Sequence, residues 1–328
     1  MDTRIDLTTF NRKMVLIRQE IARYVVGQPF AVAQLLAAII ADGHVLIEGV
    51  PGVAKTLLAK TVARLLDAEF SRIQFTPDLM PSDVLGTSVF NPKTQDFTLH
   101  KGPVFSQIVL ADEINRAPAK TQAALFEVRQ ERQATIAGIT HPMSQLFFII
   151  ATQNPIEQEG TYKLPEAQLD RFIVKITMGY PSQAEELEIL ERHQKKERMD
   201  INAIKPIFSV QDILSMRQMT DNVVVDANIL GYITRIVQNT RNNAEIYLPA
   251  SPRAAIAMLQ ISKAYAMISG RDFVTPDDVK LLAPSVLSHR LQLTAEAEME
   301  GMTIEHAIRR TLEEALVEPN QQRAIIGS

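Results

Sequence analysis

The sequence predicts a protein of two parts, an α/β part with a five-stranded parallel sheet and an all-helical part that follows it. Before residue 180, five apolar runs alternate with helical patterns, which is typical of parallel strands covered by helices on both faces. After residue 180, helix-start signals follow one another and no segment favours a strand. The 328 residues are also about the length of two ordinary domains.

The elements of the first part follow from apolar spacing and from turn residues. Phe10, Met14 and Ile17 recur at helical spacing, and Pro29 is a favoured first residue of the next helix. Short apolar runs that precede glycines or acidic residues predict buried strands. In chain order we predict helices at 10–23 and 29–41, a strand at 44–48, a helix at 55–66, strands at 72–75 and 107–111, a helix at 121–130, and strands at 146–151 and 172–177.

The second part is predicted from helix caps. Ser182 with Glu185 forms a capping box that opens a charged amphipathic helix ending near residue 196. Four further helix starts are predicted at Ser209 with Asp212, at Asp226, at Ser251-Pro252, and at Thr275-Pro276 with Asp278. We therefore place a domain boundary near residue 180, which gives domains of residues 1–180 and 181–328.

The composition excludes several kinds of protein. Apolar residues make up 46% of the chain and charged residues 22%, which excludes a disordered tail, a collagen and a coiled coil. Because the chain has no cysteine, disulfides, zinc–thiolate sites and cysteine nucleophiles are excluded. The net charge of −4 does not favour nucleic acid as a partner. With no signal-peptide pattern and no apolar run long enough to span a bilayer, we expect a cytoplasmic protein without membrane insertion.

A glycine-rich segment between a predicted strand and a predicted helix has the pattern of a phosphate-binding loop. Its residues are Gly49, Val50, Pro51, Gly52, Val53, Ala54, Lys55 and Thr56. Backbone N–H groups and the helix N-terminus would bind phosphate oxygens, Lys55 would bind the β- and γ-phosphates, and Thr56 would ligate Mg²⁺. The pattern expects glycine where Ala54 stands, and alanine is acceptable there if its φ is negative. The alternative is a glycine turn with a solvated lysine.

Polar residues follow two later strands. Asp112 and Glu113 end the strand at 107–111, where Asp112 would hold Mg²⁺ and Glu113 would orient the attacking water. Asn154 follows the strand at 146–151, and an asparagine there would bind the γ-phosphate and the water. The alternatives are a solvated acidic pair and an asparagine that starts a turn before Pro155.

Taken in order, these motifs resemble those of AAA+ ATPases, and in detail those of the MoxR family. The likeness covers roughly residues 10–315 and is carried by the segments 49–56, 111–118, 151–155 and 164–172, together with Ser251-Pro252-Arg253. The family also has alanine at the position of Ala54. The resemblance assigns no role to Arg116 or to Arg129. Arg129 departs from the small or apolar residue that we expect at its position.

The resemblance implies roles that spacing does not show. Asn154 would be the sensor-1 residue, and Arg171 the arginine finger that reaches a neighbouring subunit's nucleotide. Arg253 would be the sensor-2 residue, which contacts the γ-phosphate. The alternatives are an ion pair of Arg171 with Asp170 or Glu166 and a surface arginine at 253. The remaining cofactor-binding residues implied for ATP are Val25, Val26, Gly27 and Leu57.

Two segments match inserts of the family. Residues 78–103 are too long for a plain connection and are predicted to form a hairpin grafted onto the second helix. Residues 132–146 are predicted to form a second hairpin before sensor 1. Ordinary surface loops are the alternative, whereas the family implies elements that face the channel of a ring.

The function implied is a Mg²⁺-dependent ATPase that forms a ring, hexameric by family habit, and remodels or activates partner proteins. The implied partners are a client protein or a protein with a von Willebrand factor A domain. The alternatives are a DNA-acting AAA+ motor, a nucleotide-gated binding module that does not hydrolyse ATP, and a magnesium-chelatase-like subunit. No long basic run supports the DNA-acting motor, and Glu113 argues against the binding module.

Overall fold

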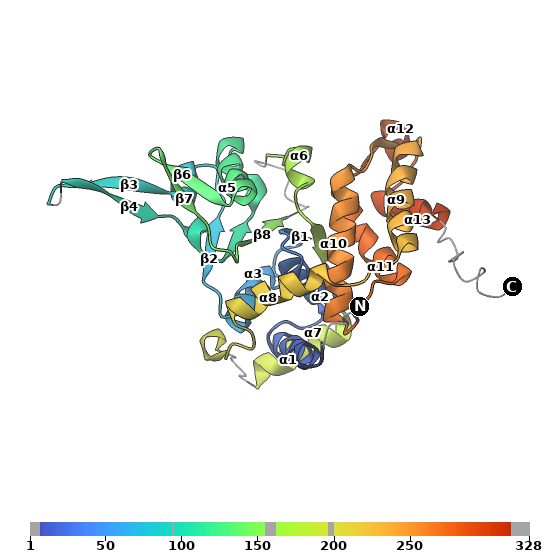
Figure 1. Ribbon diagram of the computed structural model, residues 1–328, viewed down its shortest axis with the longest axis horizontal. Helices are drawn as coiled ribbons and strands as arrows, with labels where there is room; N and C mark the ends of the chain where they lie inside the picture. Colours follow the sequence, from blue (N-terminus) through green and yellow to red (C-terminus); the bar gives the residue numbers. More distant parts are fainter. Residues whose placement is uncertain (1–6, 94, 155–161, 196–199, 316–328) are drawn as a thin grey trace.

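The computed structural model describes residues 7–93, 95–154, 162–195 and 200–315. Its centre is a five-stranded sheet in the order β2-β5-β8-β1-β9, with every neighbouring pair parallel (Figure 1). The strands are β1 (Val45–Gly49), β2 (Phe70–Gln74), β5 (Ile108–Asp112), β8 (Phe148–Gln153) and β9 (Val174–Met178). The predicted parallel sheet is therefore confirmed.

Alternate residues of each strand contribute to two different apolar clusters, because successive side chains point to opposite faces of a sheet. Val45 and Ile47 pack with the first three helices and with the helices after residue 180, while Leu46 packs with the helix Ala119–Glu131. The helices before residue 180 are α1 (Thr8–Tyr24), α2 (Pro29–Ile40), α3 (Lys55–Leu65), α4 (Pro81–Leu85), α5 (Ala119–Glu131) and α6 (Glu166–Leu169). Both faces of the sheet are thus covered, as the apolar strands require.

The region after residue 180 is mainly helical, as expected. Its helices are α7 (Gln183–Gln194), α8 (Val210–Asp221), α9 (Ala227–Asn242), α10 (Pro252–Ile268), α11 (Pro276–Leu287), α12 (Ala295–Met299) and α13 (Ile304–Glu314). All five predicted helix starts are confirmed, and at each of them the predicted cap side chain accepts a backbone N–H. The short 3₁₀ helices of the chain are η1 (Pro103–Phe105), η2 (Ile114–Arg116) and η3 (Ile201–Ala203).

The expectation of no strand after residue 180 is wrong. β10 (Ile246–Leu248) follows α9 and pairs antiparallel with β11 (Gln292–Leu293), which follows α11. We call the helical region after residue 180 the lid. Strands of three and two residues are too short to show an alternating pattern, so their sequence does not reveal them. They are stabilised by long-range pairing, and Thr294 N–H also donates to the carbonyl of Glu245 at 2.9 Å.

The helices after residue 180 share a core with the first part. α10 packs on α2, and α11 packs on β9. One continuous cluster of buried apolar side chains joins α1, α2 and α3 to helices α8 to α13. The position of a domain boundary near residue 180 therefore stays a prediction. Among the described residues, no helix is long and apolar enough to cross a membrane.

A hairpin occupies each of the two insert segments. β3 (Gly86–Asn91) and β4 (Asp96–Lys101) pair antiparallel, and this hairpin projects far from the body of the molecule (Figure 1). β6 (Gln133–Ile136) and β7 (Ile139–Pro142) form the second hairpin directly after α5. Phe90 and Phe97 face each other across the first hairpin with ring centroids 5.4 Å apart, and both are exposed.

Two buried histidines predict how stability depends on pH. Burial lowers the pKa of His44 and of His289 well below the ordinary value, and nearby arginines lower each pKa further. Below about pH 6.5 the unfolded chain binds protons that the folded chain excludes, so stability is present above that pH and is lost as pH falls. The expected loss is up to about 1.4 kcal/mol per pH unit for each histidine.

Urea denaturation between pH 7 and pH 5 measures this loss. His44 Nδ1 accepts the N–H of Ile149 at 3.0 Å, and His44→Asn keeps an acceptor there while removing the titrating ring. In this variant, the free energy of unfolding should depend on pH less steeply, by about the contribution of one histidine. The exposed His193, changed to Asn, is the control and should keep the whole slope. A slope unchanged by His44→Asn would contradict the assignment.

Candidate active site

The glycine-rich loop connects β1 to α3, as predicted. Gly52 and Ala54 both have left-handed backbone, with φ of +87° and +63°. The condition of a negative φ at Ala54 is therefore not met. Ala54 is the residue that precedes the first residue of α3, and the sharp reversal of the chain there requires the left-handed conformation. A non-glycine residue in that conformation costs on the order of 1 kcal/mol.

This backbone predicts a matched pair of opposite stability changes. Ala54→Gly should raise the free energy of unfolding by about 0.5–1 kcal/mol, because relief of strain exceeds the added entropy of the unfolded chain. Gly52→Ala should lower it by about 1 kcal/mol through strain alone, since no atom lies within 4 Å of the added Cβ. Urea denaturation without nucleotide measures both. A less stable Ala54→Gly variant would show that the methyl contacts outweigh the strain.

Lys55 lies between the ends of β1 and β8. Its Nζ donates to the carbonyl of Gly49 at 2.6 Å and to the carbonyl of Gln153 at 3.3 Å. Because these are backbone acceptors and not carboxylates, the positive charge of Lys55 is not neutralised by them. The ammonium group thus lies at the edge of the sheet where the loop begins.

Asp112 is held by contacts from two neighbouring strands. Arg72 on β2 donates to Asp112 Oδ2 from Nε at 2.9 Å and from Nη2 at 2.7 Å. Thr152 on β8 donates to Asp112 Oδ1 at 2.6 Å, and it accepts the N–H of Glu113 at 2.9 Å. The carboxylate is buried and oriented by both partners, although Arg72 would compete with a cation for Oδ2.

Glu113 has a left-handed backbone with φ of +55°, which is rare for a non-glycine residue and is common at functional sites. Its Oε2 accepts from Gln74 Nε2 at 2.8 Å and forms an ion pair with Arg116 Nε at 3.3 Å. The carboxylate is half-buried and therefore reachable from solvent. Arg116, to which the family resemblance assigned no role, therefore contacts a residue of this site.

The donors present at this edge fit magnesium. The Asp112 carboxylate and the Thr56 hydroxyl are both oxygen ligands, which Mg²⁺ prefers. No group of three His, Cys, Asp or Glu residues able to hold a metal occurs in the described part of the chain. Mg²⁺ commonly uses only one or two carboxylates together with the phosphates of its substrate. The arrangement therefore suits a cation that enters with a nucleotide.

Asn154 and the predicted segment 25–27 also lie at this edge of the sheet. Asn154 is buried and follows β8 directly, so it lies beside the ends of β1 and β5. The alternative that Asn154 starts a turn before Pro155 is not tested, because Pro155 lies outside the described residues. Gln28 Nε2 donates to the carbonyl of Gly179 at 3.1 Å, just after β9. This contact places the segment 25–27 beside the strand next to the loop, where Val25 is buried and Val26 is partly exposed.

Arg171 and Arg253 lie at the opposite edge of the sheet. Arg171 precedes β9, and both side chains line a cavity with Gly43 and His44, which precede β1. The two ends of β1 are about 13 Å apart, from the rise per residue of a strand. The structure therefore brings Lys55, Asp112, Glu113 and Asn154 together, but it does not bring Arg171 or Arg253 to the phosphate loop of the same chain.

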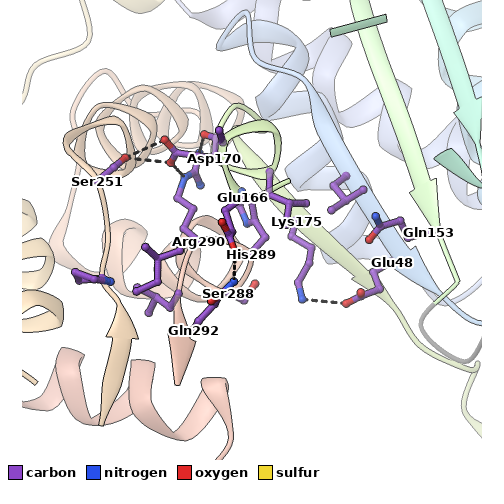
Figure 2. Close-up of a pocket in the computed structure, with 16 residues that line it drawn as sticks. Glu48, Gln153, Glu166, Asp170, Lys175, Ser251, Ser288, His289, Arg290 and Gln292 are labelled. Atoms are coloured by element: carbon purple, nitrogen blue, oxygen red, sulfur yellow. Dashed lines mark hydrogen bonds and ion pairs between the residues drawn. The ribbon is translucent and has the colours of Figure 1, made fainter. Parts of the chain in front are cut away.

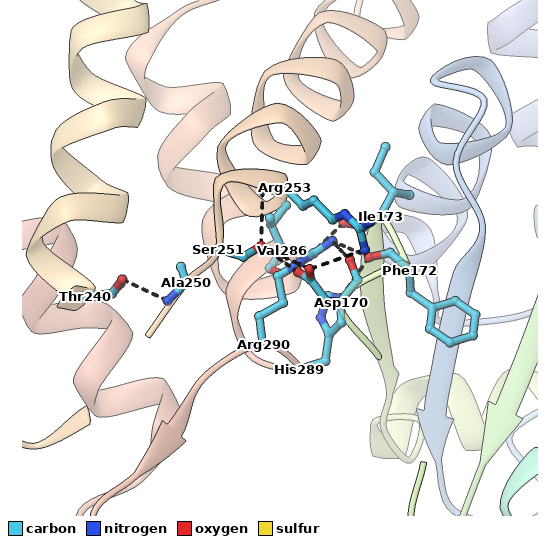
Figure 3. A network of polar contacts seen from close by, with 10 residues as sticks. All are labelled: Asp170, Phe172, Ile173, Thr240, Ala250, Ser251, Arg253, Val286, His289 and Arg290. Atoms are coloured by element: carbon cyan, nitrogen blue, oxygen red, sulfur yellow. Dashed lines mark hydrogen bonds and ion pairs between the residues drawn. The ribbon is translucent and has the colours of Figure 1, made fainter. Parts of the chain in front are cut away.

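Asp170 and Arg290 hold this second edge to the lid (Figure 3). Arg290 Nε donates to Asp170 Oδ1 at 3.0 Å, and its Nη2 donates to the Asp170 carbonyl at 3.0 Å. Ser251, the N-cap of α10, donates to both carboxylate oxygens and accepts the N–H of Arg253 at 3.2 Å. Arg171 instead donates to Gln168 Oε1 at 3.3 Å, so the ion-pair alternative with Asp170 is not observed for it.

A separate cavity of about 360 Å³ lies between the sheet and the lid (Figure 2). The ion pair of Lys175 Nζ with Glu48 Oε2, 2.9 Å long, forms its sheet side. Ser288, His289 and Gln292 form its lid side. Among the described residues that line it, none belongs to the loop 49–56.

The sequence did not reveal Arg72, Gln74 or Arg290 as parts of either edge. Arg72 and Gln74 alternate on an edge strand, and that pattern alone also fits solvated side chains. Arg290 contacts residues about 120 positions earlier, so nothing near it in the sequence identifies its partner. Its burial follows from the packing of α11 on β9, which a single sequence does not show.

Two family models match this chain. Residues 44–174 match the ATPase family associated with various cellular activities (AAA), and residues 238–311 match the AAA lid domain. The first match covers four strands of the sheet and the first residue of β9, together with the loop and the carboxylates. The second covers the lid region from within α9 to the last turn of α13.

The chain is also similar to named proteins over most of its length. It is 44% identical to Chaperone MoxR1 of Mycobacterium tuberculosis over 90% of this chain and 79% of that protein. It is 28% identical to Protein MoxR of Methylorubrum extorquens, over 95% and 97%. A crystal structure from Cytophaga hutchinsonii, described as a candidate ATPase, superposes with a TM-score of 0.87 at 41% identity and covers 94% of this chain and 96% of that chain.

Proposed function

Because this chain belongs to the MoxR family of AAA+ ATPases, we propose that it binds ATP with Mg²⁺, hydrolyses it, and assembles into a ring, of six subunits by our expectation. The observation that carries the proposal is the division of the site between two edges of one sheet. Phosphate-binding and acidic residues gather at the ends of the strands, and two arginines gather at their beginnings. A ring of like subunits would place one edge against the other.

At the first edge, the chain's own residues would bind and orient the nucleotide. Backbone N–H groups of the loop and Lys55 would bind its phosphates, and Val25, Val26, Gly27 and Leu57 would contact the rest of it. Mg²⁺, when bound by Thr56 and Asp112, would neutralise charge on the phosphate oxygens.

Glu113 and Asn154 would act on the attacking water at that edge. Glu113 would orient the water and accept its proton, once its contacts with Gln74 and Arg116 yield. Asn154 would bind the γ-phosphate and the water through its side-chain amide.

At the second edge, Arg171 and Arg253 would act on the nucleotide of a neighbouring subunit. A guanidinium group there would stabilise the negative charge that develops on the transferred phosphoryl group. Arg253 is 60% exposed, and its Nη1 lies 4.0 Å from Asp170, so it is available at the surface for such a contact. Arg253, expected from the sequence as the sensor-2 residue, would in this arrangement contact the γ-phosphate of a neighbouring subunit's nucleotide.

The proposed ring acts on a protein partner. One relative of this chain is named a chaperone, and this supports remodelling or activation of a client. A von Willebrand factor A domain protein is the partner class that we expect from the sequence resemblance. The two hairpins would contact it from the channel. The exposed aromatic pair Phe90 and Phe97 supports this role for the first hairpin.

The test is phosphate release as a function of protein concentration, with the oligomeric state followed by light scattering in the same samples. The specific activity should rise as subunits associate, and it should vanish when EDTA removes Mg²⁺. A specific activity that stays constant from monomer to oligomer would contradict the division of the site between subunits.

A further inference from the structure

Arg129 on α5 is a buried cation that forms no ion pair with any described residue. Its side chain is 7% exposed, and its guanidinium carbon lies 4.5 Å from the ring centroid of Phe172 and 5.5 Å from that of Phe126. Its Nη1 is buried and makes no hydrogen bond within the described ranges of the chain. Removing a charged group from water without pairing it is costly, and two aromatic rings compensate only part of that cost. The position of this guanidinium group therefore favours the binding of an anion beside it.

Arg129 borders a cavity of about 380 Å³ at the strand-start edge of the sheet, which we call the arginine pocket. Five arginines line it: Arg129, Arg132, Arg171, Arg253 and Arg290. They come from α5, the residue after α5, the segment before β9, the first turn of α10 and the segment after α11. Segments that are far apart in sequence thus direct positive charge to one place.

The two aspartates of the pocket are already engaged. Asp42 forms ion pairs with Arg132 and Arg217. Asp170 pairs with Arg290 at 3.0 Å and accepts Ser251. Five arginines against two aspartates leave an excess of three positive charges. His44 also lines the pocket, but its low pKa leaves it neutral near pH 7, so it neither adds to nor offsets this excess.

The excess charge acts on Arg129 itself. Burial, followed by the charges of Arg171, Arg290 and Arg253, lowers the pKa of Arg129 to about 9. The group is still cationic near pH 7, so its charge remains uncompensated. An anion in the arginine pocket would favour the charged form and relieve this repulsion.

We propose that the arginine pocket binds a phosphate-type oxyanion and that Arg129 donates to it as a buried guanidinium beside Arg171 and Arg253. Several guanidinium groups suit an oxyanion with two charges and three terminal oxygens better than they suit a single carboxylate. The oxyanion is either the phosphate chain of a neighbouring subunit's nucleotide, a source that rests on the proposed function, or a free phosphate.

The first experiment measures pyrophosphate binding to the full chain carrying Lys55→Ala. This substitution removes the contribution of the phosphate loop to the binding signal. Pyrophosphate is titrated by calorimetry at low ionic strength, at a protein concentration where the chain is monomeric. One site is expected. Adding Arg129→Met should weaken it at least about tenfold, the loss expected for one charge-assisted contact. Arg64→Met removes an exposed arginine from α3 and should leave the affinity unchanged.

Stability controls separate binding from folding. Without phosphate, the melting temperature of Arg129→Met should equal or exceed that of its parent, because methionine needs no ionic partner between the two rings. Arg129→Gln is measured instead if the methionine variant is less stable, with the same loss of affinity expected. Equal pyrophosphate affinity in the Arg129 and Arg64 variants, or no binding by the Lys55→Ala chain, would overturn the proposal.

The second experiment identifies the source of the oxyanion. Arg129→Met subunits with an intact loop are mixed with Glu113→Gln subunits, which keep Arg129. Recovery of hydrolysis on mixing would identify the neighbouring subunit's nucleotide as the source of the oxyanion. If Arg129→Met alone hydrolyses ATP fully but has lost its affinity for pyrophosphate, the oxyanion is a free phosphate. If hydrolysis is lost and mixing does not restore it, the neighbouring subunit's nucleotide is ruled out as the source. If the unmodified chain shows no concentration-dependent hydrolysis, the proposed function fails while the binding result stands.

Discussion

Glu113→Gln should abolish most ATP hydrolysis while leaving ATP binding intact. The amide has nearly the shape of the carboxylate but cannot accept a proton from the attacking water, and such a loss is on the order of 10²- to 10⁴-fold in rate. Gln74 and Arg116 contact Glu113 Oε2, and neither residue belongs to the phosphate loop. The affinity for ATP should therefore change little.

Phosphate release and equilibrium binding of a fluorescent ATP analogue measure the two effects separately. Glu296→Gln removes an exposed carboxylate from α12 and should match the unmodified protein in both. Hydrolysis by Glu113→Gln within a few-fold of the unmodified rate would remove Glu113 from the mechanism. Equal loss of ATP binding and of hydrolysis would instead indicate that Glu113 maintains the structure of the sheet edge beside the phosphate loop.

Arg171→Ala should lower hydrolysis at least about 100-fold at concentrations where the protein is assembled, because an arginine that stabilises the transition state accounts for 10³ to 10⁵ in rate. At concentrations where the chain is monomeric, the variant and the unmodified protein should have the same low rate. Within the described part of the chain, the Arg171 side chain donates only to Gln168, so its loss should not unfold the protein.

Mixing subunits tests whether Arg171 acts between chains. Arg171→Ala retains Glu113, and Glu113→Gln retains Arg171, so a mixed assembly should contain some complete sites and recover activity that neither variant has alone. Arg12→Ala removes an exposed arginine from α1 and serves as the control. If the mixture stays inactive although light scattering shows co-assembly, Arg171 does not serve a neighbouring subunit.

The residues of the strand-end edge could be predicted because their signals are local. A glycine-rich loop before a helix, an acidic pair after an apolar strand and serine caps each depend on a few consecutive residues. All ten elements whose ends were predicted lie within two residues of the observed ends. The left-handed backbone of Ala54 could not be predicted, because the turn into α3 is required by the path of the chain rather than by the preference of alanine.

The contacts of Arg290 and Arg129 could not be predicted, because each depends on residues distant in sequence. Asp170 lies 120 positions before Arg290, and the ring of Phe172 lies 43 positions after Arg129. The sequence marked Arg129 only as a departure from an expected apolar residue. Its burial beside other arginines depends on how α5, β9 and the lid pack together.

By itself, the sequence determined the elements, the loop, the acidic pair and the family, since periodicity, turn chemistry and motif spacing are properties of neighbouring residues. Only the tertiary structure decided which residues share an edge of the sheet. All five strands run parallel, so everything that follows a strand gathers at one edge and everything that precedes one gathers at the other. That direction separates Arg171 and Arg253 from the loop of their own chain, and it collects them with Arg129 around one positively charged pocket.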